Sequence, residues 1–139
     1  MLRAFAIPAD PDQIPLVRAE VLHLLEEQGC PEEVCFDIGM AFQEAVANAV
    51  IHGCKNDPAL KVHVEVETNG AGATIMVRDP GPGFDEAATR DPASPDGLVA
   101  SSGRGIAMMR AYMDNISFAR NGSEVRLQKR WKTAHTHLP

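Results

Sequence analysis

The segment FQEAVANAVIHG, residues 42–53, places a carboxylate and a carboxamide four residues apart among small apolar residues. On a helix this spacing corresponds to about 40° of rotation, so Glu44 and Asn48 project from one stripe, and His52 continues it one turn later. An amide oxygen suits a hard cation such as Mg²⁺, and a neighbouring carboxylate can deprotonate a nucleophile. The stripe is therefore either a metal and water site or an ordinary solvated helix face.

A second candidate is the segment Asp79-Pro80-Gly81-Pro82-Gly83-Phe84, which directly follows a strand expected to be buried. Glycines let the backbone approach a flat ligand, and a carboxylate at the strand end can accept a hydrogen bond from an amine on that ligand. The exocyclic amine of adenine is one such donor. The alternative is a Gly/Pro turn capped by Asp79.

The third candidate, Ser101-Ser102-Gly103-Arg104-Gly105, is expected to begin a helix. Free backbone N–H groups at a helix start form an anion nest, and the Arg104 guanidinium adds donors for phosphate. The segment is not a Walker A motif, because the chain has no Gly-Lys-Ser or Gly-Lys-Thr. The alternative is a helix cap with flexible glycines.

The elements that must position these residues follow from the periodicity of apolar side chains. Residues 2–7 predict a strand, and apolar residues spaced by three and four predict an amphipathic helix from Ile14 that stops at Gly29. A second helix is expected from Pro31 to about Gly53. Strict alternation from Lys61 to Thr68 predicts a strand with one wet face, paired as a hairpin with residues 73–79.

Residues 85–102 contain acids, prolines and hydroxyl residues with few large apolar side chains, which predicts a mobile loop of the kind that often forms a lid. Helical spacing returns from Gly103 to Asp114, and residues 115–120 and 123–131 predict a second hairpin. The tail, 132–139, is expected to fray. These elements predict an α+β two-layer sandwich: a mixed, mostly antiparallel sheet of about five strands, covered on one face by three helices.

The composition favours one folded domain over residues 1–139. The chain has 139 residues, 45% of them hydrophobic, with a net charge of −6. An acidic chain without clustered Lys and Arg argues against direct nucleic-acid binding. The longest apolar runs are about five residues, so no membrane helix or signal peptide is expected, and we place the protein in the cytoplasm. Three cysteines without CxxC spacing indicate reduced, buried thiols.

Taken in this order, residues 44–53, 79–84 and 103–106 resemble the N, G1 and G2 boxes of the GHKL ATPase/kinase superfamily, which has the Bergerat, or histidine-kinase-like, ATP-binding fold. Within it, the length and the wording of the boxes are similar to the anti-sigma-factor serine/threonine kinases, across residues 1–131. One departure is Ser102, where relatives often have a glycine, which bears on how the lid closes.

The resemblance implies ATP and Mg²⁺ as cofactors and a role for each matching residue. Glu44 would be the general base, Asn48 would bind Mg²⁺, and Asp79 would bind the adenine amine. The remaining implied contacts are the base pocket (Gly81 and Gly83) and the phosphates (Lys55, Gly103, Arg104 and Gly105). For His52 we expect packing or a backbone hydrogen bond.

By the same resemblance, the protein is expected to transfer the γ-phosphoryl group of ATP to a Ser or Thr hydroxyl of a small antagonist protein, and to sequester a sigma factor as a homodimer. One alternative is a nucleotide-gated binding regulator of the same fold that performs no phosphoryl transfer. Another is an excised histidine kinase catalytic domain.

Overall fold

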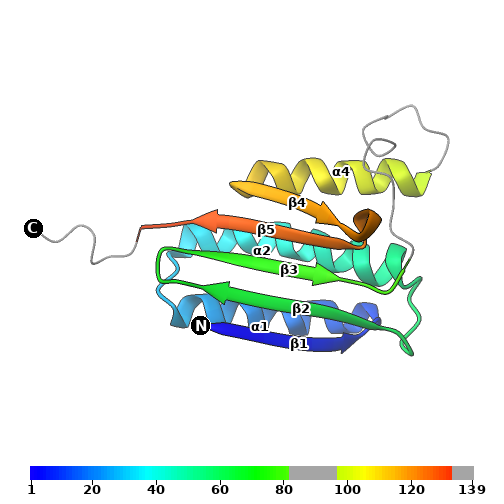
Figure 1. Ribbon diagram of the computed structural model, residues 1–139, viewed down its shortest axis with the longest axis horizontal. Coiled ribbons are helices and arrows are strands. Elements are labelled where there is room, and N and C mark those ends of the chain that lie inside the picture. The colour runs from blue at the N-terminus through cyan, green and yellow to red at the C-terminus, as the bar shows by residue number, and fades with distance from the viewer. Residues whose placement is uncertain (82–96, 133–139) are drawn as a thin grey trace, which may run out of the picture.

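A computed structural model describes residues 1–81 and 97–132, with the backbone alone for residues 97–104. Its centre is a five-stranded sheet in the order β1-β2-β3-β5-β4 (Figure 1). Every neighbouring pair in this sheet is antiparallel. The strands are β1 (Leu2–Pro8), β2 (Lys61–Thr68), β3 (Gly72–Arg78), β4 (Asn115–Ala119) and β5 (Glu124–Arg130). The expected α+β class is confirmed, with a sheet that is wholly antiparallel.

Three α-helices enclose a hydrophobic core with one face of this sheet, and α1 and α2 lie behind it in Figure 1. They are α1 (Ile14–Glu27), α2 (Glu32–Ala47) and α4 (Gly97–Tyr112). A π-helical turn, η2 (Asn48–Gly53), continues α2 without interruption. Two short 3₁₀ turns, η1 (Pro11–Gln13) and η3 (Arg120–Gly122), complete the described elements.

The core follows the predicted periodicities. On β2, Val62, Val64 and Val66 are fully buried, whereas the alternate side chains face outward. On α2, Ile38 and Phe42 are fully buried at helical spacing. We call the side of the sheet away from α1 and α2 the outer face, and none of the described elements covers it.

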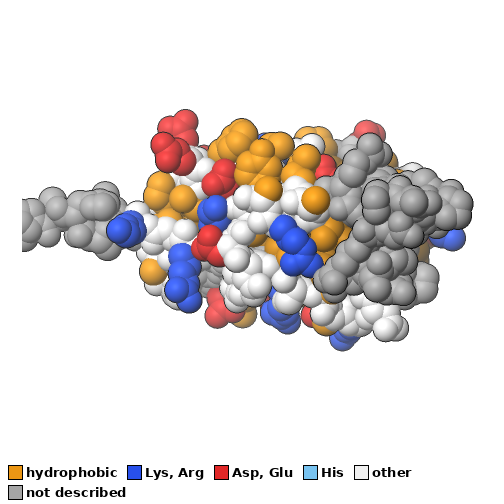
Figure 2. Space-filling model, turned by 90° about the horizontal axis from the view of Figure 1, so that it is seen from above, with side chains coloured by type: hydrophobic (Ala, Val, Ile, Leu, Met, Phe, Trp, Pro, Cys, Tyr) orange, Lys and Arg blue, Asp and Glu red, His pale blue; other side chains and the backbone are white. Residues whose placement is uncertain are grey.

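The helices also contact one another on the side that α4 occupies. Phe36 of α2 and Tyr112 of α4 meet edge to face, with ring centroids 6.2 Å apart. Seen from above, this side of the molecule shows hydrophobic side chains interspersed with both basic and acidic ones (Figure 2). The described residues on this side of the molecule therefore carry basic and acidic side chains together, with no large patch of a single charge.

Residues 32–53, which form α2 and η2, are long and apolar enough to span a membrane by length and composition alone, with a mean hydropathy of 1.4. Half of that window is buried inside the fold. A core helix of a water-soluble domain meets the same criterion, so the feature is explained by the packing of α2 between the sheet and its neighbouring helices.

The boundary of the expected lid differs from the structure. Helix α4 begins at Gly97, not at Gly103, so residues 97–102 are helical and not part of a loop. Leu98 and Ala100 are good helix formers, which favours extension of the helix upstream of the glycines. The rest of the expected lid up to residue 96, and residues 133–139 of the expected tail, lie outside the described residues.

Candidate functional site

The carboxylate of Asp79 is fixed at the end of the central strand β3. Its backbone N–H donates to the carbonyl of Ser123 at 2.9 Å. Its Oδ1 accepts from the N–H of Gly81 at 2.7 Å. Burial raises the pKa of this carboxyl above its ordinary value, and the Gly81 N–H opposes that rise. The first bond fixes the backbone of Asp79, and the second holds one oxygen of its partly desolvated carboxylate.

Two glycines form a cradle around this carboxylate. A Cβ atom on Gly53 would lie 2.3 Å from Cγ of Asp79, and a Cβ on Gly81 would lie 2.4 Å from the carbonyl oxygen of Gly53. Real Cβ atoms essentially never lie this close, so a side chain at Gly81 would clash with backbone, and one at Gly53 would displace the Asp79 carboxylate. The end of η2 and the turn after β3 therefore approach each other at backbone distance, whereas the sequence predicted a close approach of this backbone to a flat ligand.

The π-helical turn brings Gly53 to this place. The N–H of Cys54 donates to the carbonyl of Ala49, five residues earlier, at 2.9 Å, where an α-helix would use the carbonyl four residues earlier. Lys55 and Asn56 follow with positive φ values of 53° and 59° and end the helix. Lys55 is exposed.

The Glu44 and Asn48 side chains meet the third motif at the seam between α2 and α4. A Cβ on Gly105 would lie 3.0 Å from Oε2 of Glu44 and 3.4 Å from Nδ2 of Asn48. Both side chains are partly buried, and Gly105 is buried. The predicted shared stripe is confirmed, because two polar groups four residues apart face one point on the neighbouring helix. Gly105 leaves room for them.

His52 and Cys54 flank Gly53 in the chain. Nδ1 of His52 is buried and has no hydrogen-bond partner among the described residues, so the predicted backbone bond to this atom is not seen. Burial raises the pKa of the Cys54 thiol, and the nearby Asp79 carboxylate adds to the rise. All three cysteines are free and buried, as the sequence predicted.

The phosphate nest expected at the start of a helix is wrong for this structure. Gly103, Arg104 and Gly105 lie inside α4, well after its first residue Gly97, and amides in a helix interior donate to carbonyls one turn earlier. Gly83 and Phe84 lie outside the described residues.

The sequence treated Gly53 only as the end of a helix, and its contact with Asp79 was missed. A glycine directly after an apolar helical run was the available signal, but a C-terminal cap explains the same residue. The described residues contain no group of three or more His, Cys, Asp and Glu that could hold a metal ion. A cation at Asn48 would therefore take most of its ligands from elsewhere.

Residues 7–129 match the family described as a histidine kinase-like ATPase domain. The chain belongs to this family. The family resemblance drawn from the three motifs is thus confirmed, and the nucleotide of an ATPase domain is ATP. The glycine cradle at Asp79 and the polar pair of Glu44 and Asn48 are the two local arrangements described above within this family's fold.

The relatives by sequence include anti-sigma factors and a protein kinase. An "Anti-sigma F factor" of Clostridium botulinum (strain Eklund 17B / Type B) is 31% identical over 102 residues, 68% of this chain and 70% of the relative. One of Anoxybacillus flavithermus is 32% identical over 83 residues, and the match spans 57% of its length. A "Serine-protein kinase RsbW" of Oceanobacillus iheyensis is 24% identical over 116 residues, 79% of this chain and 73% of the relative.

A solved structure shares the fold. The crystal structure of the RsbU and RsbW domains of a Mycobacterium tuberculosis protein aligns with a TM-score of 0.66 at 23% identity. The alignment covers 94% of this chain and 32% of that one. At this identity the likeness supports the fold, and the chain corresponds to about a third of that protein.

Proposed function

We propose that the protein is an ATP-dependent serine/threonine protein kinase that acts as an anti-sigma regulatory factor. The observation that carries the proposal is the placement of Glu44 and Asn48 against Gly105, on the same helix whose end cradles Asp79. The proposed base-binding end and the proposed reactive end would then lie along one continuous helical run. The names of the relatives, anti-sigma F factor and serine-protein kinase, support this activity.

The residues around Asp79 fit the adenine ring. The Asp79 carboxylate would accept a hydrogen bond from the exocyclic amine, while Gly53 and Gly81 let the backbone pack directly against that carboxylate and hold it in place. Gly83 would line the same pocket. Burial has already removed part of the water around this carboxylate. A hydrogen bond from the base would therefore cost the carboxylate little further desolvation.

The residues along η2 and α4 would hold the phosphates. The Asn48 amide oxygen is the kind of neutral ligand that Mg²⁺ accepts alongside waters and phosphate oxygens. Lys55 and Arg104 are the proposed phosphate contacts by charge, and Gly103 and Gly105, inside α4, are proposed to let the phosphates come close to that helix without a free helix-start amide. The nucleotide supplies the γ-phosphoryl group, and the positive charge of Lys55 and Arg104 offsets the charge that develops on it.

Glu44 would accept the proton of the attacking hydroxyl. Its carboxylate lies beside Asn48 and so adjacent to the proposed cation, where a Ser or Thr side chain of the substrate can be oriented and deprotonated. The acceptor would be a small antagonist protein. The same chain, as a homodimer in the cytoplasm, would sequester a sigma factor until the phosphorylation state of the antagonist changes.

The test is phosphoryl transfer by a Glu44→Gln variant with labelled Mg-ATP and the candidate antagonist. We expect its rate to fall by about 10²- to 10⁴-fold, the usual contribution of a general base, while ATP affinity stays within about threefold. Glu33→Gln, an exposed carboxylate in the first turn of α2, is the matched control and should keep the rate.

Retention of the wild-type rate by Glu44→Gln would remove the general-base assignment. A stable, ATP-dependent complex of the wild-type protein with its partner, but without any labelled protein, would instead favour a nucleotide-gated binding regulator. The same preparation analysed by light scattering with a sigma factor, with and without Mg-ATP, tests the proposed homodimer and its capture of that partner.

A further inference from the structure

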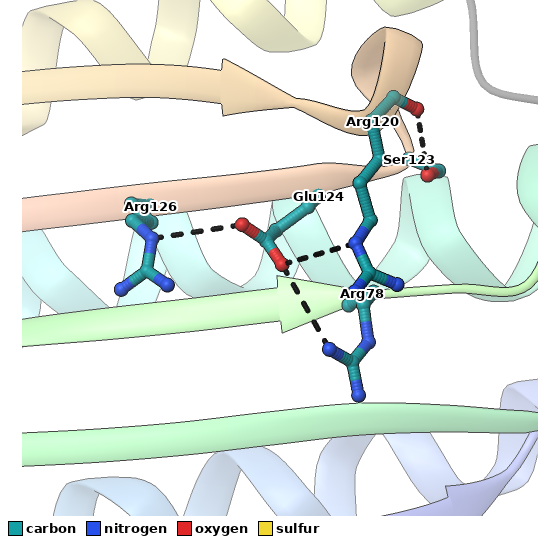
Figure 3. Close-up of polar contacts among 5 residues, drawn as sticks. All are labelled: Arg78, Arg120, Ser123, Glu124 and Arg126. Carbon is teal, nitrogen blue, oxygen red and sulfur yellow. Dashed lines mark hydrogen bonds and ion pairs between the residues drawn. The ribbon is translucent and has the colours of Figure 1, made fainter.

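Three arginines surround one carboxylate on the outer face of the sheet, at the end of β3 and β5 (Figure 3). Oε1 of Glu124 lies 3.9 Å from Nη1 of Arg78 and 3.9 Å from Nε of Arg120. Its Oε2 lies 3.6 Å from Nε of Arg126. We call Arg78, Arg120 and Arg126 the arginine cluster. They come from three parts of the chain and converge in front of the strands, away from the helices (Figure 3).

The Glu124 carboxylate cannot satisfy all the N–H donors of the three arginines. Each of the three distances is longer than a well-formed hydrogen bond, which measures about 2.7–3.2 Å. A guanidinium carries five N–H donors, and one carboxylate can pair bidentately with only one of them. Glu124 is 8% exposed, whereas the Arg120 and Arg126 side chains are 62% and 52% exposed. The donors therefore face solvent around a nearly buried acid.

The local charge is opposite to that of the chain. The arginine cluster and Glu124 together carry +2, in a protein whose net charge is −6. Across the sheet, Arg126 pairs in register with Ser117, and Glu124 with Ala119, so β4 adds no charge of its own there. On β2, Glu65 pairs with Met76 of β3 and is the acidic side chain of that strand nearest to the arginine cluster in the strand register. The outward side chains of β2 include Lys61 as well as Glu65 and Glu67, so the positive charge of the outer face is concentrated at the arginine cluster.

We propose that the arginine cluster is a docking site for an acidic segment of a partner protein. Three forked donors, to which no described residue offers an acceptor at ordinary hydrogen-bond distance, are suited to two or more additional carboxylates, spaced like the side chains of a short Asp/Glu run. Charge complementarity favours such a segment over a nucleic acid, because the acidic remainder of the chain would repel a long polyanion. The uncovered sheet face gives it an approach.

The arginine cluster is close in the backbone to the cradle around Asp79, but its side chains lie on the other face of the sheet. Arg78 immediately precedes Asp79, and the carbonyl that accepts the Asp79 N–H belongs to Ser123, between Arg120 and Glu124. The cluster points to the outer face, whereas Gly53 contacts Asp79 from the helical layer. Docking here does not depend on phosphoryl transfer, so it can be tested without ATP.

The experiment measures fluorescence anisotropy of a fluorescein-labelled hexaglutamate peptide titrated with the full-length protein at low and at high salt. A hexalysine peptide and a six-nucleotide single-stranded DNA serve as probes of other chemistry. The variants are Arg120→Gln, Arg126→Gln and the double variant, chosen because both side chains are the more exposed members of the cluster. Arg3→Gln on β1 is the matched control, with the same change in charge on the opposite edge strand.

We expect hexaglutamate to bind the wild-type protein and each single variant to weaken binding by about threefold to fivefold, as for exposed charge pairs. The double variant should lose at least about tenfold, Arg3→Gln should match wild type, and high salt should remove most of the difference. Melting curves confirm that the variants fold. Absence of hexaglutamate binding, equal binding by the double variant and Arg3→Gln, or tighter binding of the DNA probe would each overturn the proposal.

Discussion

Gly53→Ala is the substitution that most directly tests the cradle around Asp79. The added Cβ would lie 2.3 Å from Cγ of Asp79 and 2.4 Å and 2.5 Å from its two carboxylate oxygens. The three nearest atoms all belong to this one side chain. The strain is therefore relieved by displacement of the carboxylate, which breaks its 2.7 Å hydrogen bond from the N–H of Gly81.

The magnitude follows from the two opposing effects of the methyl group. A hydrogen bond to a charged group contributes about 1.5–3 kcal/mol, so ATP affinity should fall by between about tenfold and a hundredfold when the carboxylate is misplaced. Alanine also favours a helical backbone over glycine by about 1 kcal/mol, which offsets part of the clash. We therefore expect a shift of only a few degrees in the melting temperature. Calorimetric titration with Mg-ATP and thermal unfolding measure the two quantities separately.

A second background and a control make the test specific. In Asp79→Ala the clashing carboxylate is absent, so adding Gly53→Ala should cost no further affinity and should raise the free energy of unfolding by up to about 1 kcal/mol. Gly70→Ala is the control: Gly70 has φ +84°, which penalises any side chain, but a Cβ there meets nothing within 4 Å. It should lower stability and leave ATP affinity unchanged. Wild-type ATP affinity in Gly53→Ala would refute the cradle.

Three further outcomes follow from the same site. Burial raises the pKa of Asp79 in the folded protein above its value in the unfolded chain, so the folded protein binds this proton more tightly. As the pH rises from the unfolded pKa through the folded pKa, the free energy of unfolding should therefore decline and ATP affinity should increase. Thermal unfolding and ATP titrations measure both, and Asp79→Asn should abolish both pH dependences. Gly105→Ala, with a Cβ 3.0 Å from Oε2 of Glu44, should lower the phosphoryl-transfer rate by about tenfold with little change in melting temperature; an unchanged rate would separate Glu44 from the reaction. The three buried cysteines should react with an aromatic disulfide reagent only after denaturation, and fast labelling of the native protein would contradict their burial.

The sequence predicted the local elements well because their signals are periodic. Strict alternation in β2 and the three- and four-residue spacing in α2 have one physical cause each, a half-buried strand and an amphipathic helix. The Asn121-Gly122 turn between β4 and β5 has left-handed φ values of 58° and 92°, which those two residue types adopt most readily. The four-residue spacing of Glu44 and Asn48 placed both on one stripe for the same reason.

The start of α4 could not be predicted, because the residues before Gly103 carry no apolar period and their helical state depends on propensity alone. The proximity of Gly53 to Asp79 is a contact between residues 26 positions apart, and no local pattern encodes it. The arginine cluster was missed for a similar reason: Arg78, Arg120 and Arg126 are scattered in the chain, so composition shows an acidic protein. Antiparallel pairing of β3 with β5 brings them together.

The π-helical turn explains how one helix can serve both ends of the site. At Asn48 the backbone is still α-helical, since its N–H donates to the carbonyl of Glu44, and this keeps the two polar side chains on a common stripe. Beyond Asn48 the five-residue hydrogen bond from Cys54 to Ala49 accommodates an additional residue in the turn. Gly53 is thereby moved into the place where an uninterrupted helix would direct a side chain at the Asp79 carboxylate. Restoring α-helical geometry would bring the larger His52 toward that position, so the widened turn lets the glycine cradle at Asp79 and the polar pair share the continuous run of α2 and η2.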